Sequence, residues 1–188
     1  MTNASKLEEL DKRIFAIKKT NRDADVTGIL LEAFDNAVDN EERVHILSSL
    51  ASEYQTMSRS DDAEQTIRKA ITISPQSPEL WIKLAEHFHY HDVDLEKALA
   101  VTETAVDKAM DEGNFVRQAL GVRVRIATEA RHYSVVEKTL RTLLDYEPKP
   151  GTIDVKLEGD FLNAIPVGKI DEAVMNAYKE ALLGGNHV

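Results

Sequence analysis

Apolar residues recur along this chain at spacings of three and four, and polar residues fill the positions between them. This period matches the turn of an α-helix, about 3.6 residues, so the apolar side chains form a stripe on one face of each helix. No sustained alternation of apolar and polar residues, which would indicate strands, runs through the sequence. The pattern therefore predicts an all-α protein.

Prolines, glycines and polar clusters divide this pattern into helices joined by short connections. Pro78 stands in the first turn of a predicted helix, where its missing N–H is tolerated, and Gly113 suits a left-handed helix end. Short connections favour antiparallel neighbours. The predicted helices cover about residues 7–20, 26–38, 43–57, 61–74, 78–91, 95–110, 115–130 and 134–146, followed by a short helix before Pro166 and a last helix over 170–183.

One pattern of residues occurs twice in the chain, 34 residues apart. The stretch "LSSLASEY" places large and small apolar residues at the same spacing as "WIKLAEHF". Small residues let two helices approach closely, and large ones fill the gaps between helical hairpins. The matched residues are Leu47, Leu50, Ala51 and Tyr54 against Trp81, Leu84, Ala85 and Phe88 at an offset of 34, and in the following helices Ala63, Ile67 and Ala70 against Ala98, Thr102 and Ala105 at an offset of 35.

This pattern resembles that of the tetratricopeptide repeat (TPR) family. Residues 44–77 match it at every place, if Leu47 stands for the usual Trp, Ala51 for Gly and Ile67 for Phe. Residues 78–111 match it except at Thr102 and at the missing closing Pro.

The resemblance weakens on both sides of these repeats, with a degenerate unit over 11–43 and a divergent unit over 115–150. It implies antiparallel helix hairpins over 1–150, stacked as a short right-handed TPR-like superhelix, an α-solenoid. Residues 151–188 are then expected to form a C-terminal helical cap or extension.

The same resemblance implies a function without catalysis: an adaptor or scaffold that binds a peptide or helix of a partner protein in a concave groove. In TPR proteins the first helix of each hairpin lines that groove. A structural subunit that self-associates through its ends or its C-terminal helix is an alternative, so a homo-oligomer is also possible. By register, the expected groove residues are Ser48, Ser52, Gln55, Glu79, Ile82, Glu86, His89, Tyr90, Gln118 and Arg125.

The stretch "HFHYHDVD" gathers three histidines beside two acidic residues. On a helix His87 and His91 share a face, while His89 points about 200° away from His87, so the three cannot converge on one metal ion. A metal-dependent hydrolase that uses His87 and His91 is a further alternative, and histidines at the surface end of a helix are the simpler interpretation. The turn within this stretch is one residue longer than its counterparts.

Composition and charge narrow the class of partner. The chain has 188 residues, a net charge of −10 and no cysteine, which argues against nucleic acid, anionic membranes, disulfides and thiolate chemistry. No Gly-rich phosphate loop or dinucleotide fingerprint is found, so neither a cofactor nor an enzymatic activity is expected. With no signal-peptide core and no long apolar run, the sequence predicts a soluble, cytoplasmic protein.

Overall fold

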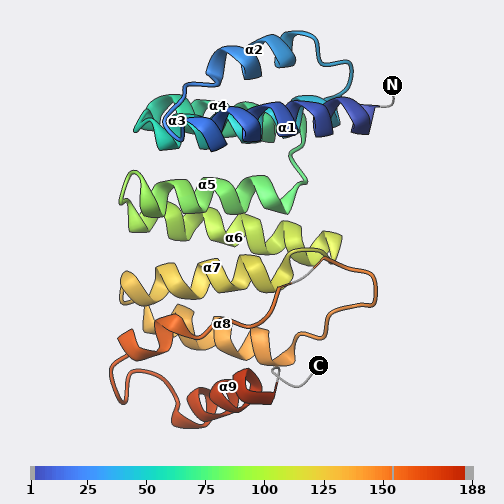
Figure 1. Ribbon diagram of the computed structural model, residues 1–188. Coiled ribbons are helices and arrows are strands. Elements are labelled where there is room, and N and C mark those ends of the chain that lie inside the picture. The colour runs from blue at the N-terminus through green and yellow to red at the C-terminus, as the bar shows by residue number, and fades with distance from the viewer. Residues whose placement is uncertain (1–2, 154, 185–188) are drawn as a thin grey trace. The chain divides into compact units, whose positions relative to one another are not determined.

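The computed structural model describes residues 3–153 and 155–184. All regular structure in these residues is helical, with nine α-helices, one short 3-10 helix and no strand (Figure 1). The prediction of an all-α fold is confirmed. The helices are α1 (Asn3–Thr20), α2 (Thr27–Asp35), α3 (Asn40–Thr56), α4 (Ser60–Ile73), α5 (Pro78–Tyr90), α6 (Leu95–Glu112), α7 (Val116–Glu129), α8 (Tyr133–Asp145), η1 (Asp160–Ala164) and α9 (Glu172–Gly184).

Residues at the helix ends explain where some of the helices begin and end. The Asp94 carboxylate accepts a hydrogen bond of 3.0 Å from the backbone N–H of Lys97 and so caps the start of α6. Gly113 ends the same helix with φ of 70°, a left-handed conformation that costs glycine little. The short helix expected before Pro166 is η1, a single 3-10 segment.

The chain divides into two compact units, residues 1–75 and residues 76–188, and each is described by itself. The division lies just after α4, between the two clear sequence repeats. Residue 150, where the sequence suggests that the repeat array ends, lies inside the second unit, and α9 packs against α8 of that unit.

In the first unit, the apolar faces of the helices pack together in one hydrophobic cluster. Leu30 of α2 and Ile46 of α3 are fully buried there, and Leu10 and Ile14 of α1 pack against the same cluster. An ion pair of 2.5 Å between Lys18 Nζ and Glu53 Oε1 also joins α1 to α3. The helix pair α3 and α4 forms the hairpin that carries the first clear sequence repeat.

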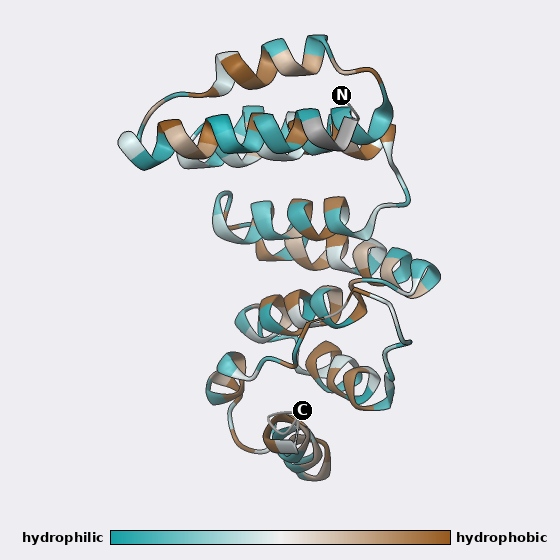
Figure 2. Cartoon of the chain, turned by 45° about the vertical axis from the view of Figure 1, so that its right-hand side comes forward, coloured by the Kyte–Doolittle hydropathy of each residue, from teal (hydrophilic) through white to brown (hydrophobic). Residues whose placement is uncertain are grey.

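In the second unit, α5 pairs with α6 and α7 pairs with α8, and the two hairpins pack on each other through α6 and α7. Hydrophobic and hydrophilic residues are interspersed along each helix, as the brown and teal segments in Figure 2 show. Phe88 and Leu140 are buried in the core, as the repeat pattern predicts. The small repeat residues Ala51, Ala63, Ala70, Ala85, Ala98 and Ala105 are also all buried, each within its own unit.

The turns inside the three hairpins close with similar backbone hydrogen bonds. The N–H of Arg59 donates to the oxygen of Tyr54 at 2.8 Å, and the N–H of His132 donates to the oxygen of Ala127 at 2.8 Å, five residues back in both cases. In the middle hairpin, the N–H of Asp94 donates to the oxygen of Phe88 at 2.9 Å, six residues back. This confirms the one-residue insertion that the repeat spacing indicates.

Helix length and apolar character also bear on membrane crossing. Among the described residues, no helix has both the length and the hydrophobicity that a membrane span needs.

Candidate functional site

The first helices of the two hairpins in the second unit, α5 and α7, lie side by side. A pocket of about 170 Å³ opens on this face. Glu86 of α5 and Gln118, Gly121 and Arg125 of α7 line it, together with the segment 155–158 from the C-terminal part of the chain. The repeat register places all four of these helix residues on a groove, and they line one pocket here. That the pocket binds a partner stays a prediction.

Arg125 is the strongest polar group at this site. Its Nη1 donates a hydrogen bond of 2.8 Å to the Tyr90 hydroxyl oxygen, and its Nη2 donates one of 2.5 Å to Oε2 of Glu158. Burial by itself would lower the pKa of Arg125, but the bonds to Glu158 and Tyr90 outweigh it and the pKa is raised. The guanidinium therefore stays charged and fixed in orientation.

The Arg125 guanidinium is not fully used by these two contacts. Its Nε is buried and has no hydrogen-bond partner among the described residues. This buried N–H therefore has hydrogen-bonding capacity that the described residues do not use.

Glu86 lies near this ion pair and carries an unfavourable charge. Burial raises the pKa of the Glu86 carboxyl, and the positive charges of Arg125 and Lys83 only partly oppose the rise. Glu158 adds to the rise, because it brings a second negative charge near Glu86. The pocket thus places one half-exposed carboxylate, Glu158, and one poorly solvated one, Glu86, near Arg125, and a second arginine, Arg117, also lines it.

The segment 155–158 reaches this pocket as chain without helix or strand. Upstream, the N–H of Phe115 donates to the oxygen of Ile153 at 2.8 Å, and the N–H of Ile153 donates to Oδ1 of Asn114 at 2.9 Å. Downstream, the buried Tyr178 of α9 donates its hydroxyl to the backbone oxygen of Glu158 at 2.7 Å. In Figure 1 this segment runs in orange across α7.

Two residues expected on the groove are instead part of the interior. Ile82 is 1% exposed and His89 is 5% exposed, so the prediction that they line an open groove is wrong. The His89 side chain also contacts α7, where its Nε2 lies 2.8 Å from Oε2 of Glu129. Neighbouring helices therefore bury a wider part of α5 than the register of one helix indicates.

The remaining predicted residues are dispersed. Glu79 is exposed in the first turn of α5 and lies outside the set that lines the pocket. Ser48, Ser52 and Gln55 lie on α3 in the first unit, where the Ser52 hydroxyl donates to the backbone oxygen of Ser48 at 3.1 Å. Their role in binding stays a prediction.

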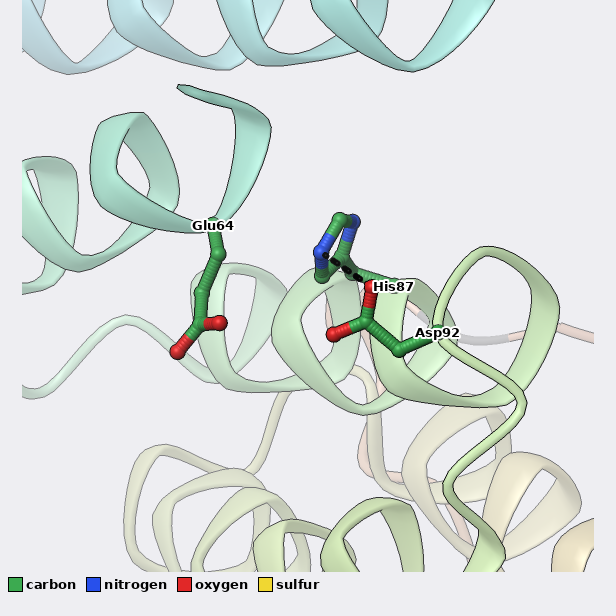
Figure 3. Close-up of side chains that lie close together, drawn as sticks. All are labelled: Glu64, His87 and Asp92. Carbon is green, nitrogen blue, oxygen red and sulfur yellow. Dashed lines mark ion pairs between the residues drawn. The ribbon is translucent and has the colours of Figure 1, made fainter. Parts of the chain in front are cut away.

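The histidines of "HFHYH" occupy different surroundings. His87 is fully buried, and its Nε2 lies 3.7 Å from Oδ1 of Asp92 (Figure 3, which also draws Glu64 of the first unit). The exposed His91 stacks on His87 with 5.6 Å between ring centroids. The expectation of surface histidines therefore holds for His91 and is wrong for His87 and His89. A metal-dependent activity at His87 and His91 stays a prediction.

Sequence reasoning missed the chain's own contribution to this site. It predicts residues 155–158 and Tyr178 only as parts of a cap or extension. One signal is present: Ile153, Val155 and Leu157 alternate with polar residues, the period of an extended segment that presents one side to a surface.

Comparison with protein-family models gives no match, and comparison with curated proteins gives none either. Among solved structures, the chain is similar to the crystal structure of BtubC (BKLC) from P. vanneervenii. The TM-score is 0.64 at 15% sequence identity, over 97% of this chain and 72% of that one. At this identity the likeness concerns the fold alone.

Proposed function

We propose that this chain is a non-catalytic protein-interaction module built from TPR-like hairpins stacked as a short right-handed superhelix. On this proposal the face of α5 and α7 binds an extended segment of a partner protein. The 34-residue repeat and the burial of its small residues support the hairpin assignment.

The observation that carries the proposal is that a segment of the chain without helix or strand already lies on this face. Residues 155–158 line the pocket beside α7, and the Glu158 side chain reaches Arg125. Gly121 lies beside this carboxylate, since a Cβ added there would stand 4.0 Å from Oε2 of Glu158, an ordinary contact distance, and only a longer side chain would need the space that Glu158 occupies. The face therefore has the shape and the donors needed to hold a peptide.

The chemistry of the face favours recognition of a carboxylate. An arginine whose orientation is fixed by a second hydrogen bond, here to Tyr90, loses little entropy when it binds an acidic group. The surroundings are partly apolar, with Val122 and Leu143 beside the charged residues. A partner segment is thus expected to combine apolar side chains with an acidic one.

Selection from a displayed library of random peptides against the purified full chain tests this proposal. The selected peptides should bind the wild-type chain and should bind the Arg125→Glu variant at least about tenfold more weakly, because the charge that reads the carboxylate is reversed. The matched control is Lys138→Glu, which makes a comparable charge reversal at an exposed site on α8. Peptides that bind all three chains equally would contradict the proposal.

Self-association is the second candidate, and exposed apolar residues near the C-terminal end of the second unit favour it. Val167 is 94% exposed and Leu183 of α9 is 71% exposed. If these residues bind a second copy, the mass in solution should rise with concentration, and Val167→Lys with Leu183→Lys should abolish the rise. A monomer at every concentration contradicts this candidate.

A further inference from the structure

The segment 155–158, "VKLE", has the character of a bound ligand rather than of a connecting loop. Its charged end pairs with Arg125, and Leu157 lines the apolar part of the pocket with Val122, Leu143 and Tyr178. Leu157 therefore contacts the apolar side of the pocket, and the next residue, Glu158, pairs with Arg125.

The chain upstream of this segment permits a second, open arrangement. "EPKPG" separates the segment from α8, and Gly151 takes a φ of 83° there. The Glu158 side chain is about half exposed, and the pair it forms with Arg125 is the kind that contributes modestly to stability. Displacement of the segment breaks the ion pair to Arg125 and the hydrogen bond from Tyr178 and removes Leu157 from the pocket, while the two hairpins keep their contacts with each other.

We propose that residues 155–158 are an internal ligand that closes the α5–α7 groove, and that the partner is an extended segment carrying the same pair, an apolar residue followed directly by an acidic one. The partner replaces Leu157 and Glu158 at their sites. This inference rests on the proposed function, because it names what the groove recognises and what holds it closed.

A tethered ligand competes strongly even when its own affinity is low. A short flexible tether gives the segment an effective concentration on the order of millimolar. The apparent affinity of the groove for an external peptide is then its intrinsic affinity multiplied by the fraction of chains in which the segment has left the groove. Weakening the internal contact must therefore tighten external binding, a result that a purely structural role for the segment does not give.

The test measures the fluorescence anisotropy of a labelled synthetic peptide, "TIDVKLEGD", which copies residues 152–160. It is titrated with the full wild-type chain, with Glu158→Lys, and with the control Glu147→Lys, which makes the same charge change outside the pocket. Glu158→Lys should bind the peptide about tenfold more tightly than wild type. Glu147→Lys should bind it as wild type does.

A second variant keeps the test decisive if Glu158→Lys is poorly folded. The double variant Arg125→Glu with Glu158→Arg restores the internal pair with its charges exchanged. It should bind the native peptide more weakly than wild type, and it should bind better a peptide with Arg in place of the Glu.

The outcomes separate this inference from the proposed function. Equal affinity of the wild-type and Glu158→Lys chains for the labelled peptide, and for peptides from the library selection, overturns the internal ligand and leaves the groove proposal standing. Failure of every peptide to bind in an Arg125-dependent way overturns both. Chains that exchange this segment in a dimer, detected by mass, with unchanged peptide affinity also overturn the internal ligand.

Discussion

The hydroxyl of Tyr178 donates a hydrogen bond of 2.7 Å to the backbone oxygen of Glu158. Through this bond α9 holds the backbone of the segment whose side chain reaches Arg125 on α7. The segment is thus fixed from two sides, by its backbone to the last helix and by its carboxylate to the groove. The packing of α9 therefore helps to set where the segment meets the groove.

Replacing Tyr178 by Phe keeps the ring in the core and removes only the hydrogen-bond donor. We expect a loss of about 1 kcal/mol in the free energy of unfolding, measured by urea denaturation, because one intramolecular hydrogen bond is lost. Tyr133→Phe is the matched control, since the Tyr133 hydroxyl makes no hydrogen bond to a described residue and its Phe variant should be near neutral. An equal loss in the two variants would show that the bond to Glu158 adds nothing.

Gly121 separates two effects of side-chain size at the groove. Gly121→Ala should raise the free energy of unfolding by up to about 1 kcal/mol, because alanine favours the helix and its Cβ fits at 4.0 Å from Glu158. Gly121→Leu should instead occupy the space of the Glu158 side chain and accelerate amide exchange at 155–158. If both variants leave this exchange unchanged, Glu158 does not depend on the room that Gly121 provides.

Val93 stands in the lengthened turn between α5 and α6 with a φ of 54°, and it is largely exposed. A β-branched residue is strained in this left-handed region, by roughly 1–2 kcal/mol, whereas asparagine tolerates it. Val93→Asn should therefore raise the melting temperature by a few degrees, on the order of 2–4 °C per kcal/mol for a chain of this size.

The control for this effect is Val38→Asn, which changes an exposed valine outside the left-handed region. It should leave the melting temperature nearly unchanged. A similar rise in both variants would point to the added polar side chain rather than to backbone strain at Val93.

Burial raises the pKa of Glu86, so the folded chain holds this proton more tightly than the unfolded chain does. The charged carboxylate therefore costs stability at neutral pH, and the cost disappears as the pH falls through the raised pKa. Glu86→Gln should be more stable than wild type at neutral pH, with an advantage that shrinks in acid, measured by denaturation over a pH series. Glu103→Gln, at an exposed site on α6, is the control, and an advantage of Glu86→Gln that grows in acid would contradict the sign.

Much of the fold follows from residues that are close in sequence. The period of the apolar positions predicts each helix, and Asp94 and Gly113 mark two of their ends through contacts with their own neighbours. The one-residue insertion is visible because it shifts Ala98 relative to Phe88, and the turn hydrogen bond at Asp94 records the same shift. Features of this kind can be read from the sequence, because each depends on residues a few positions apart.

The candidate site is only partly predictable, because it depends on contacts between distant residues. The register of single helices brings Glu86, Gln118 and Arg125 together correctly. It fails for His89, which is buried and contacts Glu129, 40 residues away. Glu158 lies 33 residues from Arg125 in a stretch with no helical period, so no repeat pattern could place it.

The most direct test of a site shared by partner and segment is amide hydrogen exchange at residues 155–158 of the full chain, with and without a saturating groove-binding peptide from the library selection. Exchange in helices α5 and α7 of the same sample serves as the internal reference. We predict that the peptide accelerates exchange at 155–158, because it displaces the internal segment while the helices stay protected. Unchanged exchange at 155–158 with the peptide bound would contradict the claim that partner and segment share one site.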